Sequence, residues 1–244
     1  MLEIPSMRPE TRYGIPSADR YLFNRRYIVG YSYLFRQPQW VAELIDPDSL
    51  VVNQDERLNN FRPDQRIPEM FRSDLDDFRG TGLDRGHMVS SADRREKAIS
   101  NSETFLLSNM CPQHPSLNRK IWRVLEEQVR FLAGQEEILE VYVVSGILFD
   151  ITKEFQLIGQ GESKVIVPHF FFKSIVAENI RGKLDLWTFR FPNEQCDDEL
   201  NEYLIKTRKV EVWSGLSLWD RIQSQSFEGL KNETNSWVML DDPR

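Results

Sequence analysis

Cysteine is scarce in this chain of 244 residues, which contains only Cys111 and Cys196. Two cysteines cannot build the multi-bridge framework of small secreted domains, and no CxxC pair suggests a zinc site. One bridge between the two thiols stays open as an alternative. Two free thiols in a reducing compartment are the simpler interpretation, and the one we favour.

Long apolar runs are also lacking, and none approaches the roughly 20 residues needed to cross a bilayer. Residues 1–5 show no basic stretch followed by an apolar segment, so we expect neither a signal peptide nor an Arg-rich transit peptide. Two compartments stay open. A bacterial protein would be cytoplasmic, and a eukaryotic protein whose leader had been removed would be mitochondrial.

Net positive charge is absent as well. The 31 Lys and Arg residues against 38 Asp and Glu residues give a formal net charge of -7. This balance argues against a protein that coats nucleic acid by bulk electrostatics, but it allows an enzyme with a local basic cleft. With 40% hydrophobic residues, the chain has the composition and length of a globular domain with a substantial core.

The patterns that are present predict an α+β fold with a central, mostly antiparallel sheet flanked by helices. Pro168 should interrupt one strand or place it at an edge. Strands are expected where β-branched and aromatic residues concentrate, at 27–34, 39–45, 140–146, 164–177 and 184–191.

Helices are expected at 118–133 and 199–212, from their helix-forming residues and the apolar periodicity of the first. Residues 53–82 carry many charges and scattered prolines, which predicts a long functional loop. We divide the chain into an N-terminal arm at 1–18, one domain at 19–222 and a C-terminal tail at 223–244.

Of the three histidines, His87 alone has a setting suited to chemistry. His114 stands in a polar turn and His169 in an aromatic strand, so structural roles are expected for both. His87 closely follows Asp84 and Arg85. The carboxylate can hold a water or a side chain, the guanidinium suits phosphate oxygens, and an imidazole is a suitable general base.

Four residues of the predicted helix recur at every fourth position, namely Asn118, Trp122, Glu126 and Arg130. Four residues turn an α-helix by about 400°, so these side chains should form one stripe. The stripe could equally be a solvated face with Glu126 and Arg130 as an ordinary ion pair worth ~0.3–0.5 kcal/mol. Trp122 could stack on a base, but we favour packing against the sheet.

Three further residues are ambiguous when taken alone. Asn109 stands where an apolar run meets a polar turn, which suits an ordinary turn residue. Arg57 and Arg62 lie in the long loop, where most arginines are simply solvated. Only their context can favour a functional role.

That context comes from a resemblance. Asp84-Arg85-Gly86-His87 resembles the DRGH signature of the DNA/RNA non-specific endonucleases, the ββα-metal (His-Me finger) nucleases, and the chain is most similar to their endonuclease G branch. Ile147 stands where the family usually has proline. Similar blocks occur in the family's order at 57–64, 104–113, 118–126, 144–146, 167–173 and 191–193, so the resemblance covers about residues 13–220.

The resemblance implies an Mg²⁺-dependent endonuclease, with Mn²⁺ as a substitute, that hydrolyses DNA and RNA to 5′-phosphate and 3′-hydroxyl ends. It implies these roles: His87 as general base, Asn118 as the direct metal ligand, Glu126 as a holder of metal-bound waters, Arg57, Arg85 and Arg130 as phosphate contacts, and Asp84 and Asn109 as positioning residues.

Two alternatives accompany this hypothesis. One is a 5′ exonuclease of the same fold, and the other is a catalytically silent nucleic-acid-binding or regulatory relative. The resemblance also admits a homodimer and an inhibitor or regulatory partner. No membrane partner is expected, because the chain lacks an apolar run long enough to cross a bilayer.

Overall fold

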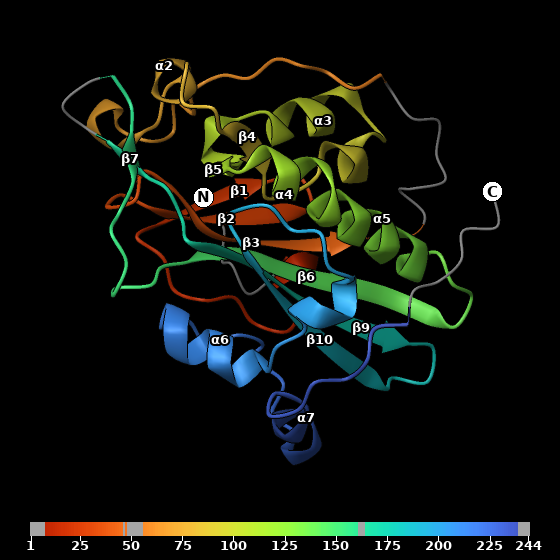
Figure 1. Cartoon of the computed structure of the whole chain (residues 1–244). Coiled ribbons are helices and arrows are strands. Elements are labelled where there is room, and N and C mark those ends of the chain that lie inside the picture. Colours follow the sequence, from red (N-terminus) through yellow and green to blue (C-terminus); the bar gives the residue numbers. More distant parts are fainter. Residues whose placement is uncertain (1–7, 46, 48–55, 161–163, 239–244) are drawn as a thin grey trace.

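A six-stranded antiparallel sheet forms the centre of the molecule (Figure 1). The computed structural model describes residues 8–45, 47, 56–160 and 164–238. The ends of the predicted arm and tail, and residues 53–55 of the predicted loop, lie outside these ranges. The strand order is β1-β2-β3-β6-β9-β10. The strands are β1 (Arg20–Asn24), β2 (Tyr27–Ser32), β3 (Gln37–Ile45), β6 (Ile138–Leu148), β9 (Phe170–Asn179) and β10 (Leu184–Pro192).

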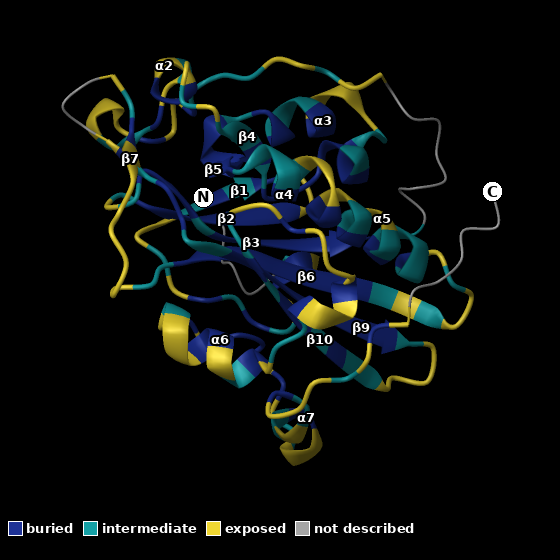
Figure 2. Ribbon diagram, viewed as in Figure 1, coloured by how far each residue is buried: buried dark blue, intermediate teal, exposed yellow. Residues whose placement is uncertain are grey.

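Helices cover both faces of this sheet (Figures 1 and 2). On one face lie α3 (Ala98–Thr104), α4 (Pro115–Arg119) and α5 (Ile121–Ala133), and on the other lie α6 (Thr207–Ser214) and α7 (Gln225–Leu230). Because both faces are covered, the central strands are buried almost throughout, as the dark blue ribbon in Figure 2 shows. This burial explains why they read as continuous apolar runs in the sequence.

The alternation of side chains along each strand divides the core into two layers. Val143 packs in the layer that contains Leu125 of α5, and Val144 packs in the layer that contains Val210 of α6 and Phe227 of α7. Helix α5 is thereby fixed to the sheet by one apolar face, which leaves its other face available for the site.

A separate hairpin lies beside the helices. Strand β4 (Asp84–His87) pairs antiparallel with β5 (Met110–Gln113), and α4 begins two residues later. This strand–strand–helix unit places His87 opposite Met110. The remaining short elements are β7 (Leu157–Ile158) paired with β8 (Val165–Ile166), α2 (Leu75–Phe78), and 3-10 turns at Pro9–Thr11, Glu69–Phe71, Ser91–Arg94, Leu107–Asn109 and Leu200–Tyr203.

The predicted helix 118–133 is wrong in one respect, because it is two helices broken at Lys120, whose backbone has φ -113° and ψ -99°. A continuous helix would turn Asn118 and Trp122 to the same side. In the structure Trp122 is only 1% exposed within the core, while Asn118 lines a cleft. Because of the break, Trp122 can pack in the core while Asn118 lines the cleft.

The predicted helix 199–212 is also wrong as a single element. The segment starts as a 3-10 turn, and then Leu204 bridges to Phe189 of the edge strand β10. The backbone N–H of Ile205 donates to the carbonyl of Thr188 at 2.8 Å, and α6 begins only at Thr207. Pairing with the sheet edge thus replaces the middle of the predicted helix.

Other expectations agree more closely. The interruption expected at Pro168 is confirmed, since β8 ends at Ile166 and β9 starts at Phe170. Cys111 and Cys196 are buried and free, which confirms that the two thiols are unpaired, while the reducing compartment stays a prediction. Strand β1 was not predicted. No helix within the described ranges is long and apolar enough to span a membrane.

The described ends of the chain pack against the body. The Tyr13 hydroxyl donates to Glu178 at 2.6 Å, and Trp237, 3% exposed, contacts the rings of Trp187 and Phe189. The division into arm, domain and tail remains a prediction.

Gly146 of β6 offers a test of the close packing between β6 and its neighbouring strands β9 and β3. A Cβ atom there would lie 2.3 Å from the Phe172 ring and 2.9 Å from the Gln39 carbonyl oxygen. Gly146→Ala should lower the free energy of unfolding by about 1–3 kcal/mol, measured by urea denaturation. Gly134→Ala is the control, because its Cβ would meet nothing closer than 3.5 Å. Equal stabilities of the two variants would contradict this packing.

Candidate active site

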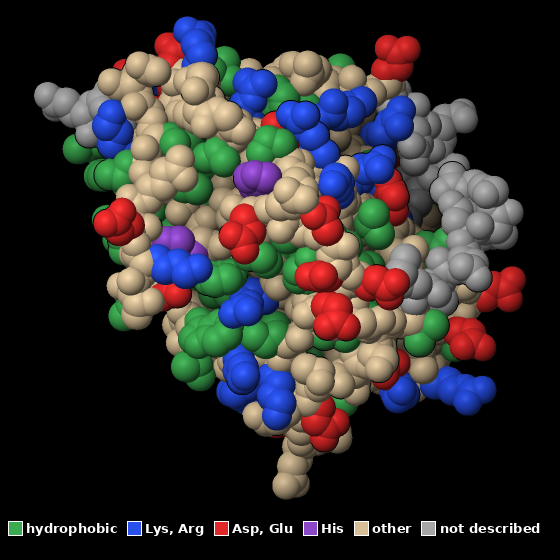
Figure 3. Space-filling view, in the orientation of Figure 1, with side chains coloured by type: hydrophobic (Ala, Val, Ile, Leu, Met, Phe, Trp, Pro, Cys, Tyr) green, Lys and Arg blue, Asp and Glu red, His purple; other side chains and the backbone are tan. Residues whose placement is uncertain are grey.

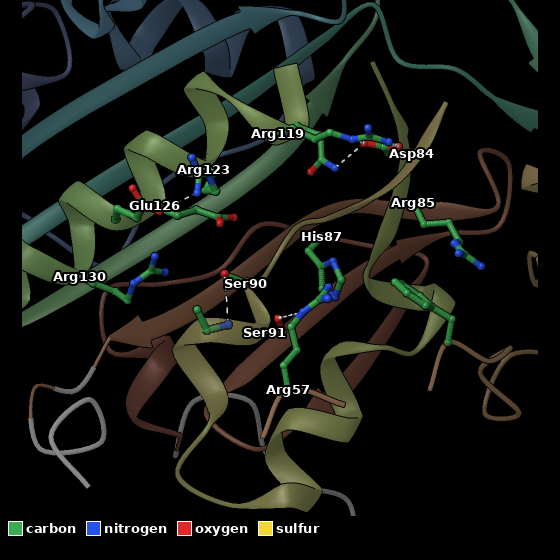
Figure 4. A pocket seen from close by; sticks show the side chains of 14 residues that line it. Arg57, Asp84, Arg85, His87, Ser90, Ser91, Arg119, Arg123, Glu126 and Arg130 are labelled. Carbon is green, nitrogen blue, oxygen red and sulfur yellow. Dashed lines mark hydrogen bonds and ion pairs between the residues drawn. The ribbon is translucent and has the colours of Figure 1, made fainter. Parts of the chain in front are cut away.

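A cleft of about 630 Å³ opens where the β4–β5 hairpin faces α4 and α5. Seven of the eight residues assigned roles from the sequence line it, and only Asn109 does not. Arg62 also lies elsewhere, with Nη1 donating to the carbonyls of Asn60 and Ser102. The cleft residues are Arg57, Phe61, Asp84, Arg85, His87, Ser90, Ser91, Ala92, Asn118, Arg119, Arg123, Glu126, Glu127 and Arg130 (Figure 4).

His87 ends strand β4 and lies centrally in this cleft (Figure 4). Its ring meets the edges or faces of Phe61 and Phe105, at centroid distances of 5.6 and 5.1 Å. Its Nε2 atom is buried and makes no hydrogen bond within the described protein. Burial, together with the nearby charges of Arg57 and Arg85, lowers the pKa of His87 to about 3. The imidazole is therefore neutral at physiological pH and can accept a proton.

The carboxylate of Asp84 joins the hairpin to α4. Its Oδ2 accepts hydrogen bonds from Asn118 Nδ2 at 2.9 Å and from Arg119 Nε at 2.8 Å, and its Oδ1 accepts from Arg119 Nη2 at 2.7 Å. Burial acts to raise the pKa of Asp84, but these donors outweigh it and hold the pKa below its usual value. Since the Asn118 amide nitrogen is committed to Asp84, the amide oxygen is the atom left for a ligand.

Asn109 is fully buried behind His87 rather than in the cleft. Its Oδ1 accepts from the Val89 amide at 3.0 Å, and its Nδ2 donates to the carbonyls of Val89 and Thr104 at 3.0 and 2.9 Å. Its own carbonyl accepts from the Met88 amide. These bonds fix the chain immediately after His87, which supports the predicted positioning role.

Glu126 and Arg130 both face the cleft from α5, but Arg130 pairs elsewhere. Its Nη1 lies 2.6 Å from Asp93 Oδ1, so the ordinary Glu126–Arg130 pair considered from the sequence is not the contact that forms. Glu126 Oε1 is buried without a hydrogen-bond partner in the described protein. Burial raises the pKa of Glu126 to about 7, against the opposing charge of Lys173.

Trp122 does not reach the cleft. Its ring lies 5.8 and 5.9 Å from those of Phe171 and Phe191, and the Lys173 ammonium lies 4.5 Å from its centroid. The packing interpretation is confirmed. The other two histidines also have structural contacts: His114 caps α4 by accepting from the Ser116 amide, and Nδ1 of His169 accepts from the Asp150 amide.

Five arginines line the cleft, and two of them, Arg119 and Arg123, were missed in the sequence. Arg57 donates to Ser91 Oγ at 3.1 Å, and the guanidinium of Arg85 lies 4.2 Å from the Phe61 ring centroid. Figure 3 shows basic side chains gathered over the helices beside the hairpin. The one signal in the sequence for Arg123 is its position four residues before Glu127. That spacing equally suits an ordinary ion pair on a solvated helix face.

The oxygen atoms on α4 and α5 fit a magnesium site that is largely hydrated. No group of three or more His, Cys, Asp or Glu residues suited to a metal occurs in the part of the chain described. What the cleft offers is the Asn118 amide oxygen and the unpartnered Glu126 carboxylate oxygen. Mg²⁺ keeps several waters and prefers such hard oxygen ligands, whereas a closed zinc site needs four protein ligands.

The comparisons with known proteins agree with this site. A model of the family "DNA/RNA non-specific endonuclease" matches residues 6–225. Mitochondrial endonuclease G of Homo sapiens is 33% identical over 84% of this chain and 71% of the relative, and a mitochondrial nuclease of Saccharomyces cerevisiae is 33% identical over 95% and 75%. A solved complex of EndoG with its inhibitor EndoGI superposes with a TM-score of 0.81 at 32% identity, covering 88% and 91% of the two chains.

The fold and the cleft define a nuclease of the α+β, ββα-metal class, a group of metal-dependent enzymes. Within that class the chain belongs to the DNA/RNA non-specific endonuclease family, with relatives of the endonuclease G type. Both the resemblance noted in the sequence and the expected fold class are thereby confirmed.

The two asparagines should respond differently to substitution. Asn109→Ala leaves three buried backbone groups without partners and should lower the free energy of unfolding by about 3 kcal/mol or more. Asn118→Ala removes one bond to a carboxylate that Arg119 still holds, and should cost about 1 kcal/mol or less. Urea unfolding without divalent metal checks this. Similar losses in both variants would contradict the division of roles.

His87 should titrate well below an ordinary histidine. NMR of its ring protons in the metal-free protein should place the pKa near 3, and Arg85→Gln should raise it, because removing a nearby cation favours imidazolium. Between that pKa and about 6.5 the unfolded chain binds the extra proton, so this group makes stability rise with pH across the window. An unshifted His87, or a fall in its pKa in Arg85→Gln, would contradict the assignment.

Proposed function

We propose that this nuclease is an Mg²⁺-dependent, sugar-non-specific endonuclease that cuts DNA and RNA and leaves 5′-phosphate and 3′-hydroxyl ends. The observation that carries the proposal is the placement of His87. A neutral imidazole lies in a cleft with five arginines, across from an amide and a carboxylate on the facing helices. Those are the groups that metal-assisted phosphodiester hydrolysis requires.

In the proposed mechanism, the His87 imidazole accepts the proton of the attacking water. Asn109 holds the chain after His87 in position, while Arg57 and Arg85 meet the phosphate oxygens and the charge that grows in the transition state. Because the imidazole is neutral before the reaction, its capacity as a base persists across the physiological pH range.

Asn118 and Glu126 are the residues that would hold the metal, the first directly and the second through water. The bond from Asn118 to Asp84 orients the amide so that its oxygen is free for coordination. A bound Mg²⁺ would supply charge compensation at the leaving 3′ oxygen. Arg130, which is held by Asp93, adds positive charge on α5, the helix that also carries Glu126.

The chemistry of the cleft favours little discrimination among substrates. Its charged donors are arginines, which suit phosphate oxygens, and phosphate contacts carry no direct sequence information. Discrimination of DNA from RNA would require a contact to the 2′-hydroxyl. We therefore propose activity on both polymers.

The relatives suggest where and with what the enzyme acts. Both human and yeast relatives are named as mitochondrial, so we propose a mitochondrial location, which their names favour over the cytoplasmic alternative. The solved EndoG–EndoGI complex suggests a protein inhibitor for this chain too. Cell fractionation and affinity capture from the same fractions test these proposals. The homodimer stays a prediction, which analytical ultracentrifugation would test.

Digestion of circular plasmid and of RNA tests the function directly. Wild-type protein with Mg²⁺ should cut both, and EDTA should stop cutting. His87→Ala and Asn118→Ala should each lose at least about 10²-fold in rate, because each removes a group with its own part in the chemistry. His169→Ala, a histidine outside the cleft, is the control.

Two results would contradict the proposal. Full cleavage by His87→Ala would contradict the assignment of His87 as the general base. Digestion of linear but not circular DNA would favour the 5′ exonuclease alternative, and failure of the folded wild-type protein to cut any substrate would favour the silent relative.

A further inference from the structure

A second group of cations lies outside the cleft and is centred on Arg190 of β10. The neighbouring residues Phe189 and Phe191 both pack in the core layer of α5, so the alternation of the strand turns Arg190 to the α6 face. The guanidinium carbon lies 4.7 Å from the ring centroid of Phe170 and 4.9 Å from that of Trp213. Arg190 therefore makes cation–π contacts with both rings.

The charge of Arg190 has no acidic partner. Within the described residues its guanidinium makes no hydrogen bond and no ion pair beyond the two ring contacts. Burial lowers the pKa of Arg190, and no carboxylate of the described chain offsets that effect. Cation–π contacts hold the guanidinium without occupying its N–H donors. Those donors are therefore available to an anion from outside the protein.

Three lysines without ion pairs flank Arg190. Lys206, Lys209 and Trp213 stand at the start and along one flank of α6, within about 60° of one another around its axis. The Lys153 ammonium lies 5.3 Å from the ring centroid of Phe170. In the part of the chain that the structure describes, none of these lysines lies within ion-pair distance of a carboxylate.

These residues form one basic and aromatic surface, which we call the Arg190 surface. None of them lines the cleft that contains His87. Figure 3 shows basic side chains next to hydrophobic ones over α6. The members of the surface are Lys153, Phe170, Arg190, Lys206, Lys209 and Trp213. Because the whole chain carries a net charge of -7, such a group of unpaired cations is a local exception.

The chemistry of the Arg190 surface fits single-stranded nucleic acid. Its cations suit phosphates, and Trp213, which is 47% exposed, offers a ring to an unstacked base. Bases inside a duplex already stack on one another, and an acidic peptide would use the cations alone. Glu154 and Glu194 line the cavity of about 220 Å³ beside Phe170, so the contact should centre on Arg190 and Trp213 instead.

We propose that the Arg190 surface binds a single-stranded segment of DNA or RNA outside the cleft, with Arg190 and Lys209 at phosphates and Trp213 against a base. The inference rests on the proposed substrate being nucleic acid, and not on the mechanism at His87. A polynucleotide held at this surface keeps its other segments at a raised effective concentration near the cleft.

Binding without cleavage tests the inference. The measurement is the Kd of a fluorescein-labelled oligothymidylate of twenty nucleotides, by fluorescence anisotropy in the His87→Ala background with EDTA. Arg190→Gln and Lys209→Gln should each raise this Kd about threefold to tenfold and reduce the slope of log Kd against log salt by about 0.7. Photocrosslinking of an oligonucleotide that contains iodouracil, followed by peptide mass spectrometry, should identify Trp213.

Arg181→Gln is the matched control, because it removes the same charge from the exposed turn at the other end of the β9–β10 hairpin. If Arg190→Gln and Lys209→Gln both bind like Arg181→Gln, the inference is wrong. Lys209 is exposed, so loss of packing cannot account for its effect.

Competition separates nucleic acid from an acidic protein. A polyglutamate peptide of the same length should displace the labelled oligothymidylate far less well than unlabelled oligothymidylate does, since it lacks bases for Trp213. Equal displacement would overturn the assignment to nucleic acid. Absence of cleavage by folded wild-type protein would contradict the proposed function, but it would leave this binding measurement valid.

Discussion

The carboxylate of Asp84 is the contact on which the cleft depends. It belongs to strand β4, yet its hydrogen bonds come from Asn118 and Arg119 of α4, so it ties the hairpin that carries His87 to the helix that faces it. A charge-assisted, two-pronged bond from an arginine gives both strength and a fixed direction. The same carboxylate therefore sets the distance across the cleft and the orientation of the proposed metal ligand.

Behind the cleft lies a layer of buried charge. Arg94 pairs with Glu43 of β3 at 2.9 Å with both side chains almost fully buried, and the adjacent Asp93 binds Arg130. Desolvating such pairs is expensive, so they are weak evidence for stability. Here they connect the central sheet to an arginine of the site. The burial that raises the pKa of Glu126 belongs to this same layer.

Much of this arrangement could be predicted from residue patterns, and the failures have physical causes. His87 and the six other cleft residues were expected to act together because the resemblance rests on several motifs that contain them, although the local pattern alone favoured only His87. The positioning role of Asn109 was expected only through resemblance and stays a prediction, since the two hydrogen bonds that hold Val89 join residues 20 positions apart. The break at Lys120 has no local signal, because it arises from the opposite demands of Asn118 and Trp122. Tertiary contacts override helix propensity there, as they do at Leu204.

The acidic balance of the chain complements its basic cleft. With a net charge of -7, the chain as a whole repels a polyanion, so the favourable contact depends on local groups of basic side chains such as the cleft arginines. Phosphate contacts are salt-dependent and few, which favours release of the cut ends. An enzyme that turns over many times benefits when few phosphate contacts hold its product.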